Sequence, residues 1–418
     1  MEGKSKKVII LIIGIVLVIA LTIVAFNWKK LNTNNENNKE PEQKEPIKPR
    51  EDLKDDIVYA FLKLENDKTN KIYSPLSIRY ALQILAEGAE GESREQLDAV
   101  LGEYNTNKYS SIEEHLGFGN ALFIRDAYYK KVKQDYLDTV KEKYDAEILE
   151  DKFEDAKNVN KWIEEKTLGL IKNMLRDSQV NDPDLEMIIV NALAIDMDWE
   201  HKFDGENTYG SEFIKADGKK MTAETMHETF KDESLAYYQD EDVTVVRLNL
   251  EKYDDKQFEF FAIMPDEDLA NYIDNFSNEK FAELTSDMKL ASSNKGGVAL
   301  AIPRFDFETD LKFVDDLRSL GIENIFYQEK ANLTKIVDKE ESLLYVGDAL
   351  HHAKIEFSEK GIKAAAVTVI FMKDSAFYQE EEPLRISINK PFMFVIRDKQ
   401  TNDIWFVGAV FEPEESKN

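Results

Sequence analysis

The histidines are the first residues to test for chemistry, because an imidazole ring can act as a base or bind a metal. Of the five histidines in the chain, only His351 and His352 are adjacent. A catalytic or metal-binding pair would need both rings at one site. Neighbouring residues of a strand point to opposite faces, so the sequence favours a structural role for this pair over a ligand role.

Signatures of catalysis, cofactor binding and metal binding are missing from the sequence. It contains no Gly-x-Ser-x-Gly elbow, no phosphate-binding Walker loop, no Gly-x-Gly-x-x-Gly and no His-Glu-x-x-His. The acidic run Glu380–Glu382 is typical of a solvated surface. Cysteine is absent, which excludes disulfides and thiol chemistry but not an extracellular location, because a domain of this size needs no covalent cross-links. We therefore expect no enzyme activity, no cofactor and no metal.

The stretch Glu359–Thr368 has the composition of a hinge that can become a strand. Gly361 and Ala364–Ala366 allow the backbone to change conformation at low cost, and the β-branched run Val367–Ile370 favours a pleated strand. No proline follows Gly361 until Pro383, so nothing interrupts strand pairing over this distance.

Alternation along such a strand would divide its residues between two faces. One face would be uncharged and suitable for burial, and it comprises Ile362, Ala364, Ala366, Thr368 and Ile370. The other face would carry Lys363, Ala365, Val367, Val369 and Phe371, where the lysine could reach solvent. The polar stretch Lys373–Pro383 that follows is expected to be exposed.

An apolar run near the start of the chain predicts a membrane anchor. Residues 8–26 are uninterrupted by charge and come close to the ~20 residues that a helix needs to cross a bilayer. Lysines flank the run on both sides, and Trp28 follows it as an interfacial aromatic. The run lacks the small-residue cleavage site of a signal peptide, so we favour an uncleaved single-pass anchor, with secretion after cleavage as the alternative. Residues 1–7 would then be cytoplasmic and the rest of the chain extracellular.

Two further regions follow the apolar run. Residues 27–50, rich in asparagine, proline and charge from Asn32 onward, predict a disordered linker. Residues 51–414 form the globular domain. The chain has 82 acidic against 54 basic residues and a formal charge of −28, which argues against nucleic acid as a partner.

Helical and strand patterns alternate irregularly through the globular region. Apolar spacing predicts a first amphipathic helix over Glu51–Leu64 and a second that begins at Ser74-Pro75 and ends at Gly88. A helix follows over Val132–Glu147. Met187–Ile195 is apolar on both faces and predicts a buried strand. The mixture indicates an α+β fold.

Several motifs in this order resemble the serpins, the serine-protease-inhibitor superfamily. They include Ser74-Pro-Leu-Ser77-Ile, Asn191 with Trp199 and Phe203, Phe258–Asp266, Ile302-Pro-Arg-Phe305, Asn389-Lys-Pro-Phe392 and Phe406–Pro413. Each is weak alone, but together they cover about residues 52–413. The resemblance implies a fold with three β-sheets, about eight helices and an exposed reactive-centre loop. The connection between Leu101 and Asn120 is short and poor in basic residues, so the helix that binds polyanions in some members is expected to be curtailed or missing.

The resemblance also implies roles for named residues. The hinge of the reactive loop would comprise Glu359, Gly361, Ile362, Lys363, Ala364, Ala365, Ala366, Val367 and Thr368. The region where the main sheet opens would include Ser74, Ser77, Asn191, Trp199 and His351. Inhibitory members carry Thr or Ser where Ile362 stands and an acid where Lys363 stands, yet neither departure adds a charge or a proline to the buried face.

Family spacing counted from Glu359 puts the reactive bond at Ser375-Ala376. Counting back from Asn389 instead lands nearer Tyr378, because this loop is longer than usual. Lys373 would suit a trypsin-like protease, Ser375 an elastase- or subtilisin-like one, and Phe377 or Tyr378 a chymotrypsin-like one.

The resemblance therefore implies a suicide-type inhibitor that acts on an extracellular serine protease or cysteine protease. In this interpretation the cleaved loop enters the main sheet and traps the acyl-enzyme, and the inhibitor is a monomer. The alternatives are a non-inhibitory serpin and a cell-surface binding or scaffold protein.

Overall fold

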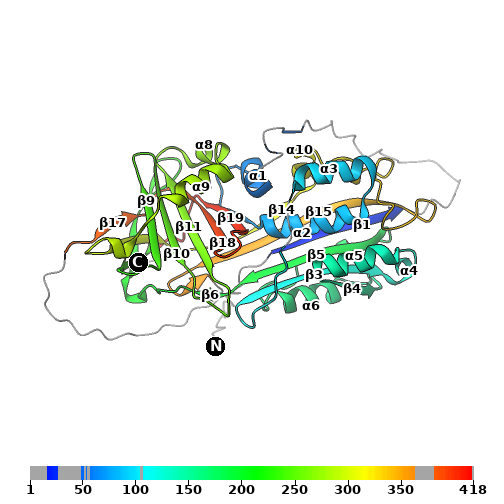
Figure 1. The fold of residues 1–418 in the computed structure, drawn as a ribbon, viewed down its shortest axis with the longest axis horizontal. Coiled ribbons are helices and arrows are strands. Elements are labelled where there is room, and N and C mark those ends of the chain that lie inside the picture. Colours follow the sequence, from blue (N-terminus) through cyan, green and yellow to red (C-terminus); the bar gives the residue numbers. More distant parts are fainter. Residues whose placement is uncertain are drawn as a thin grey trace, which may run out of the picture.

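Three β-sheets and a set of helices make up the part of the chain that the structure, a computed structural model, describes (Figure 1). The described residues are 17–26, for their backbone, and 49–50, 53, 57–103, 107–362 and 381–416. Fold class and the three sheets match the expectation. Among the described residues there are ten α-helices, four of which span only one or two turns.

The main sheet is the longest layer of the molecule (Figure 1). In the following series each strand is hydrogen-bonded to the next: β4 (Ala146–Asp151), β3 (Leu116–Arg125), β5 (Leu185–Ile195), β1 (Leu17–Phe26), β15 (Leu343–Phe357), β16 (Gly361–Ile362) and β6 (Met197–Asp198), and β14 (Phe305–Lys312) also pairs with β15. Every residue of β5 is buried, because helices cover both faces of the sheet there.

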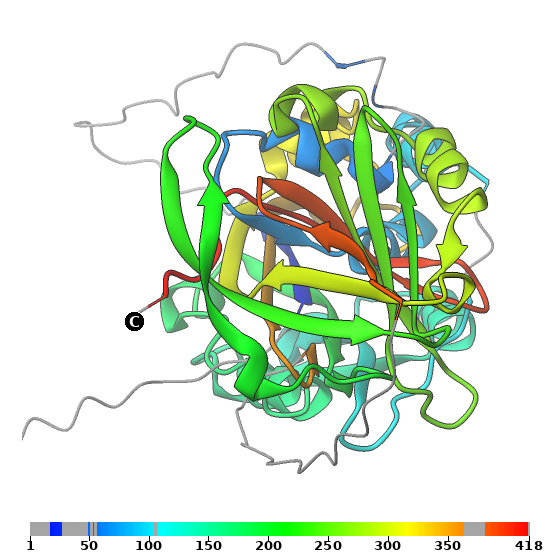
Figure 2. The same cartoon turned by 90° about the vertical axis from the view of Figure 1, so that its left-hand side faces the viewer.

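The second and third sheets lie at the other end of the molecule. The second sheet orders β12 (Lys289–Leu290), β9 (Leu235–Gln239), β10 (Val243–Asn249), β11 (Phe258–Pro265), β18 (Phe392–Asp398), β19 (Ile404–Val410) and β2 (Lys71–Tyr73). The third orders β17 (Leu384–Ser387), β13 (Val298–Pro303), β8 (Lys220–Phe230) and β7 (Thr208–Ile214). Seen from that end, strands of the third sheet lie in front of the second (Figure 2).

The helices are mostly amphipathic and pack on the sheets. They are α1 (Ile57–Leu64), α2 (Pro75–Gly88), α3 (Gly91–Leu101), α4 (Asp126–Tyr129), α5 (Gln134–Tyr144), α6 (Lys157–Lys166), α7 (Asp177–Val180), α8 (Leu269–Asp274), α9 (Asn278–Ser286) and α10 (Val314–Ser319), with short 3-10 turns at Gly205–Asn207, Ala291–Ser293 and Asn324–Phe326. The predicted start of α2 is confirmed: Ser74 caps the helix by accepting from the Ser77 amide, and Pro75 occupies the first turn. The described residues between α3 and β3, 102–103 and 107–115, form no helix.

Two hydrophobic cores lie on opposite faces of the main sheet. The larger fills the space between the main sheet, α2 and the second sheet. The smaller lies beneath α6, where Val159 and Ile163 pack with Ile188 and Val190 of β5. The end of α6 approaches β3 so closely that a Cβ at Gly117 would lie 2.2 Å from the Lys166 carbonyl oxygen, which only glycine permits.

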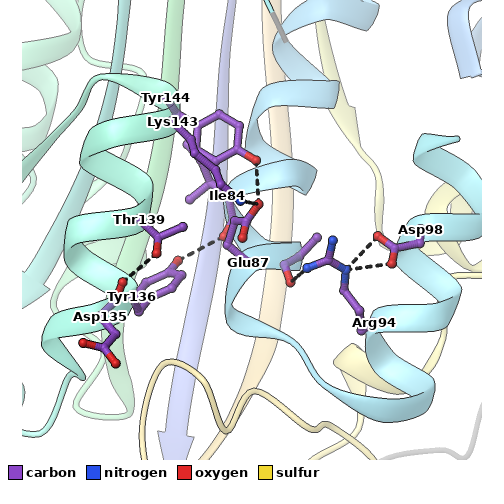
Figure 3. Close-up of polar contacts among 10 residues, drawn as sticks. Ile84, Glu87, Arg94, Asp98, Asp135, Tyr136, Thr139, Lys143 and Tyr144 are labelled. Carbon is purple, nitrogen blue, oxygen red and sulfur yellow. Dashed lines mark hydrogen bonds and ion pairs between the residues drawn. The ribbon is translucent and has the colours of Figure 1, made fainter. Parts of the chain in front are cut away.

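Polar contacts fix α2 against α3 and α5 (Figure 3). Glu87 of α2 accepts hydrogen bonds from Lys143 at 2.9 Å and from the Tyr144 hydroxyl at 3.1 Å. Burial and the nearby Glu87 carboxylate raise the pKa of Tyr144, so its hydroxyl keeps its proton and donates. Arg94 of α3 donates to the Ala86 carbonyl of α2 at 2.9 Å, and Asp98, one turn on in α3, accepts from the same guanidinium at 2.7 Å. These contacts hold the helix whose first turn carries Ser74 and Ser77.

Candidate functional site

A tight turn between β15 and β16 marks the start of the predicted reactive loop. The Ser358 amide donates to the Gly361 carbonyl at 3.1 Å and closes the turn. Ile362 pairs with Phe357 of β15 on one side and with Met197 of β6 on the other. The chain is described again from Glu381 and enters β17 at Leu384. The loop therefore leaves from the main sheet and returns to the third sheet.

Trp199 contacts this turn through both its side chain and its backbone. Its side chain is buried, and its indole N–H donates to the Ser358 carbonyl at 2.8 Å. Its backbone amide donates to the Lys360 carbonyl at 2.6 Å. The ring also packs edge-on against Phe357, with 5.1 Å between ring centroids. The structure thus places Trp199 at the base of the predicted hinge.

The predicted hinge residues Glu359, Gly361 and Ile362 are described, and all three are held in place. The Phe203 amide donates to the Glu359 carbonyl at 2.9 Å. A Cβ at Gly361 would lie 2.0 Å from the Met197 carbonyl oxygen, so a larger residue cannot fit without moving the backbone. Ile362 is fully buried.

Charged residues surround the turn. Arg304 contacts Glu359 at 3.5 Å and Glu414 at 3.6 Å. Glu356, near the end of β15, lies opposite Asp306 of β14 in the strand register. Burial, together with the Asp306 charge, raises the pKa of Glu356 to about 7, and one of its buried carboxyl oxygens has no hydrogen-bond partner among the described residues. A titratable group therefore lies next to the hinge.

Strand β1 continues the column of β16 between β15 and β5. β16 pairs with β15 and β6, and β1 pairs with β15 and β5. β14 pairs with β15 from Leu350 to Phe357, so β1 and β16 both lie on the other edge of β15. β1 is antiparallel to both neighbours, and Val18 pairs with His352 on one side and with Ala192 on the other. β1 and β16 thus share one position across the sheet, end to end.

Leu17–Phe26, part of the run predicted to form a membrane-spanning helix, form the strand β1 in this structure. The run is rich in valine and isoleucine, which fit a strand as well as an apolar helix, and here β5 and β15 bond its backbone on both sides. Residues 8–16 lie outside the described part. Within the described part, none of the helices has the length and apolar character required to cross a bilayer.

A polar network runs beneath β1 from β5 to β15. The Ser77 hydroxyl donates to the Asn191 side-chain oxygen, and the Asn191 amide donates to Asn120 at 2.8 Å. The Ser74 amide donates to His351 Nε2 at 3.1 Å. Four of the residues predicted for the sheet-opening region, Ser74, Ser77, Asn191 and His351, are thus brought together, and Trp199 lies apart at the turn.

His351 and His352 face opposite ways, as the strand pattern predicts. Burial, with a contribution from His352, lowers the pKa of His351 well below its usual value, so its ring is neutral. His351 Nδ1 is buried without a partner among the described residues. His352 Nδ1 instead lies 2.5 Å from Asp310 on β14. The structure therefore does not join the two rings in one site.

The remaining predicted site residues lie outside the described part. They are Lys363, Ala364, Ala365, Ala366, Val367 and Thr368 of the hinge, the reactive bond Ser375-Ala376 and its alternatives Lys373, Phe377 and Tyr378. Their roles stay predictions. Of the acidic run, Glu381 forms an exposed ion pair with Lys295 at 3.1 Å.

Two residues of the site were missed from the sequence. Arg304, the ion-pair partner of Glu359, lies within a quoted motif but carries no signal of its own. Asn120, which extends the network from Asn191, begins a strand-like run in which a buried asparagine could have been noticed. β1 is the larger omission, because nothing in an apolar run predicts the column of the sheet that it enters.

Comparison with known proteins agrees with this architecture. A serpin-like protein of the archaeon Methanosarcina mazei is 29% identical over 370 residues, which cover 83% of this chain and 82% of that protein. The crystal structure of tengpin, a thermophilic serpin, in the native state matches with a TM-score of 0.69 and 24% identity, covering 93% of this chain and 100% of that one. The structure of thyroxine-binding globulin complexed with thyroxine also has a TM-score of 0.69, at 22% identity, covering 87% of this chain and 99% of that one.

The two solved structures show a common fold. The family assignment comes from a family model described as "Serpin (serine protease inhibitor)", which matches residues 57–413 and so spans nearly all of the globular domain, including both ends of the loop. The chain belongs to the serpin family.

Proposed function

We propose that this serpin is a suicide-type protease inhibitor. Its loop, residues 363–380 between β16 and β17, would serve as bait for a serine protease or, as a second class, a cysteine protease. After cleavage the loop would enter the main sheet as a new strand and trap the protease before the intermediate is hydrolysed.

The observation that carries this proposal is the pairing of β16. Ile362 already pairs with β15 and β6 in the antiparallel sense. Continued in the same register, the next residues would run between β15 and β5, with Ala364 opposite Ile355 and Ala366 opposite Ala353. β16 would thus form the first residues of the inserted strand, and the small residues that follow it suit a crowded central position.

The chemistry belongs to the target protease. Its serine hydroxyl, or a cysteine thiolate, attacks the Ser375 carbonyl carbon, and the bond to the Ala376 nitrogen breaks. The nucleophile's proton is passed through the protease's histidine to the departing Ala376 amine, and Ser375 is left as an ester or thioester on the enzyme. Insertion of the freed hinge would then displace the bound protease and distort its active site.

We also propose that residues 8–26 can anchor the protein in a cell membrane, with the serpin domain outside. The support is the uncharged apolar run flanked by lysines, and a secreted form is the alternative. Protease treatment of intact cells tests the location: the domain should be degraded without cell lysis. Degradation only after lysis would contradict it.

A non-inhibitory serpin is the second candidate, and one observation favours it. The column that the loop would enter is filled by β1 in this structure. A permanently filled column would leave no place for insertion. The likeness to thyroxine-binding globulin shows that the fold also occurs in a protein that binds a small ligand. Inhibition therefore requires β1 to leave its position.

Incubation with trypsin, chymotrypsin, elastase and subtilisin tests the proposal. We expect a covalent complex that survives denaturing electrophoresis with at least one of them. Ala365→Pro should abolish the complex and leave a cleaved substrate, because proline blocks strand pairing, whereas the control Ala365→Ser should still inhibit. Cleavage without a complex by every protease, or undiminished inhibition by Ala365→Pro, would contradict the mechanism.

A further inference from the structure

The space between β5 and β15, which we call the strand slot, has the properties of a binding site for one extended segment. β5 on one side and β15 on the other offer antiparallel backbone partners along the whole length of β1. Every residue of β5 is buried, so a strand that enters the slot also loses its contact with water. The slot therefore selects for an uncharged segment.

The register shows that β1 and the loop would need the same positions. Val18 pairs with His352 and with Ala192. If the chain continued from β16 without a shift, Val367 would meet the same two residues. The ten residues of β1 would then coincide with Ala366–Ser375, which ends at the predicted reactive bond.

The two segments differ in charge. β1 reads LVIALTIVAF and carries no ionisable side chain. The corresponding loop segment ends in Lys373-Asp374-Ser375, so its full insertion would bring two charges toward the end of the sheet. By this criterion the N-terminal segment is the better ligand, and it is tethered to the same chain, which raises its effective concentration.

We propose that the strand slot binds residues 17–26 and the inserting loop in competition, so that the N-terminal segment controls whether the serpin can act. With β1 in the slot, a cleaved loop cannot enter and the protein is a substrate. With the apolar segment in a lipid bilayer, the slot is free, because the same backbone cannot pair with β5 and cross a membrane. The control of inhibition by the N-terminal segment rests on the proposed inhibitory function. The competition of residues 17–26 and the loop for the strand slot does not.

Cysteine cross-linking in the full chain tests the competition, because the chain has no native cysteine. Ala20→Cys with Leu350→Cys joins two residues that face each other in the β1–β15 register. Phe26→Cys with Leu343→Cys is a second matched pair, at a position where Leu343 is 40% exposed and tolerant of change. Ala20→Cys with Leu343→Cys is the mismatched control, because its two sites are about 23 Å apart along the strands.

We expect both matched pairs to form disulfides at least tenfold faster than the control. A synthetic peptide with the sequence of Ala366–Ser375 should slow this cross-linking at least fivefold, and reconstitution of the chain into phosphatidylcholine vesicles should do the same. Equal rates in matched and mismatched pairs would overturn the proposal, as would cross-linking that neither the peptide nor the vesicles reduce.

Inhibition of proteases is a separate readout in the same variants. The oxidised matched pairs should give at least tenfold less covalent protease complex than the same samples after reduction. Equal amounts of complex before and after reduction would overturn the regulatory role. If peptide-sensitive cross-linking occurs and no protease forms a complex in any sample, the strand slot is confirmed as a binding site and the proposed inhibitory function fails.

Discussion

Replacing Gly361 with alanine should destabilise the start of the loop specifically. The added Cβ would lie 2.0 Å from the Met197 carbonyl oxygen and 2.7 Å from the Asp198 Cα, where ordinary contacts begin at 3.4 Å. Both obstacles are backbone atoms, so a rotamer change cannot relieve the clash. β16 must move away from β6, which also disturbs the Ser358–Gly361 hydrogen bond.

The expected cost follows from these two effects. Overpacking of a tight site costs about 1–3 kcal/mol, and each lost backbone hydrogen bond about 1 kcal/mol. We therefore expect Gly361→Ala to lower the free energy of unfolding by ~2–4 kcal/mol. Urea unfolding followed by circular dichroism measures this loss.

Gly205→Ala is the matched control, because a Cβ there meets no atom within 4 Å and the backbone has no positive φ. Its effect should stay within about 0.5 kcal/mol. If the two variants unfold at the same urea concentration, the close approach of β16 to β6 does not exist in solution. The tight packing of Gly361 against Met197 and Asp198 is then refuted.

Three further predictions concern the same region. Glu359→Lys, which replaces the ion pair with Arg304 by two cations, should lower the free energy of unfolding by ~1–2 kcal/mol in urea titrations, and an unchanged midpoint would contradict the contact. Because burial raises the folded-state pKa of Glu356 from an ordinary 4.5 to about 7, the folded protein binds more protons than the unfolded chain in that window, and stability should fall as pH rises from 4.5 to about 7. Urea midpoints across this range should show a shallower slope in Glu356→Gln. Burial also raises the pKa of Asp316 to about 7, so that carboxyl contributes in the same direction in both proteins. Asn191→Leu should cost ~1–3 kcal/mol in thermal unfolding, because it leaves buried hydrogen-bonding groups without partners, and a neutral effect would refute the network.

The sequence predicted α2 and β5 correctly, because residues close in sequence specify both elements. The cap at Ser74 and the proline that follows it located the start of α2, and the two-sided apolar run at Met187–Ile195 located β5. These features depend on residues close in sequence, whose periodicity and capping preferences are intrinsic to the chain.

The contacts of the site depend on residues far apart in sequence. Ser74 and His351 are 277 positions apart, and Trp199 and Ser358 are 159 apart. No pattern within either segment indicates the other. The association of Ser74, Ser77, Asn191 and His351 was expected only from the resemblance to serpins.

The apolar run at Leu17–Phe26 shows a different limit. Its length and composition favour a membrane helix when the run is considered alone. In the fold, β5 and β15 supply backbone partners on both sides. A strand with two neighbours therefore satisfies the backbone hydrogen bonds of these residues as well as a helix would. Sequence composition cannot distinguish a bilayer from a dry sheet interior, since both exclude charge.

The mass of the product formed with a protease tests the inhibitory account most directly. After incubation with the protease panel and denaturation, the account predicts one covalent species whose mass equals the protease plus residues 1–375, with residues 376–418 released as a separate peptide. A covalent complex whose mass corresponds to cleavage at another bond of the loop would move the reactive bond toward Lys373, Phe377 or Tyr378. Two cleaved fragments with free protease, even when the strand slot is free of β1, would contradict the account.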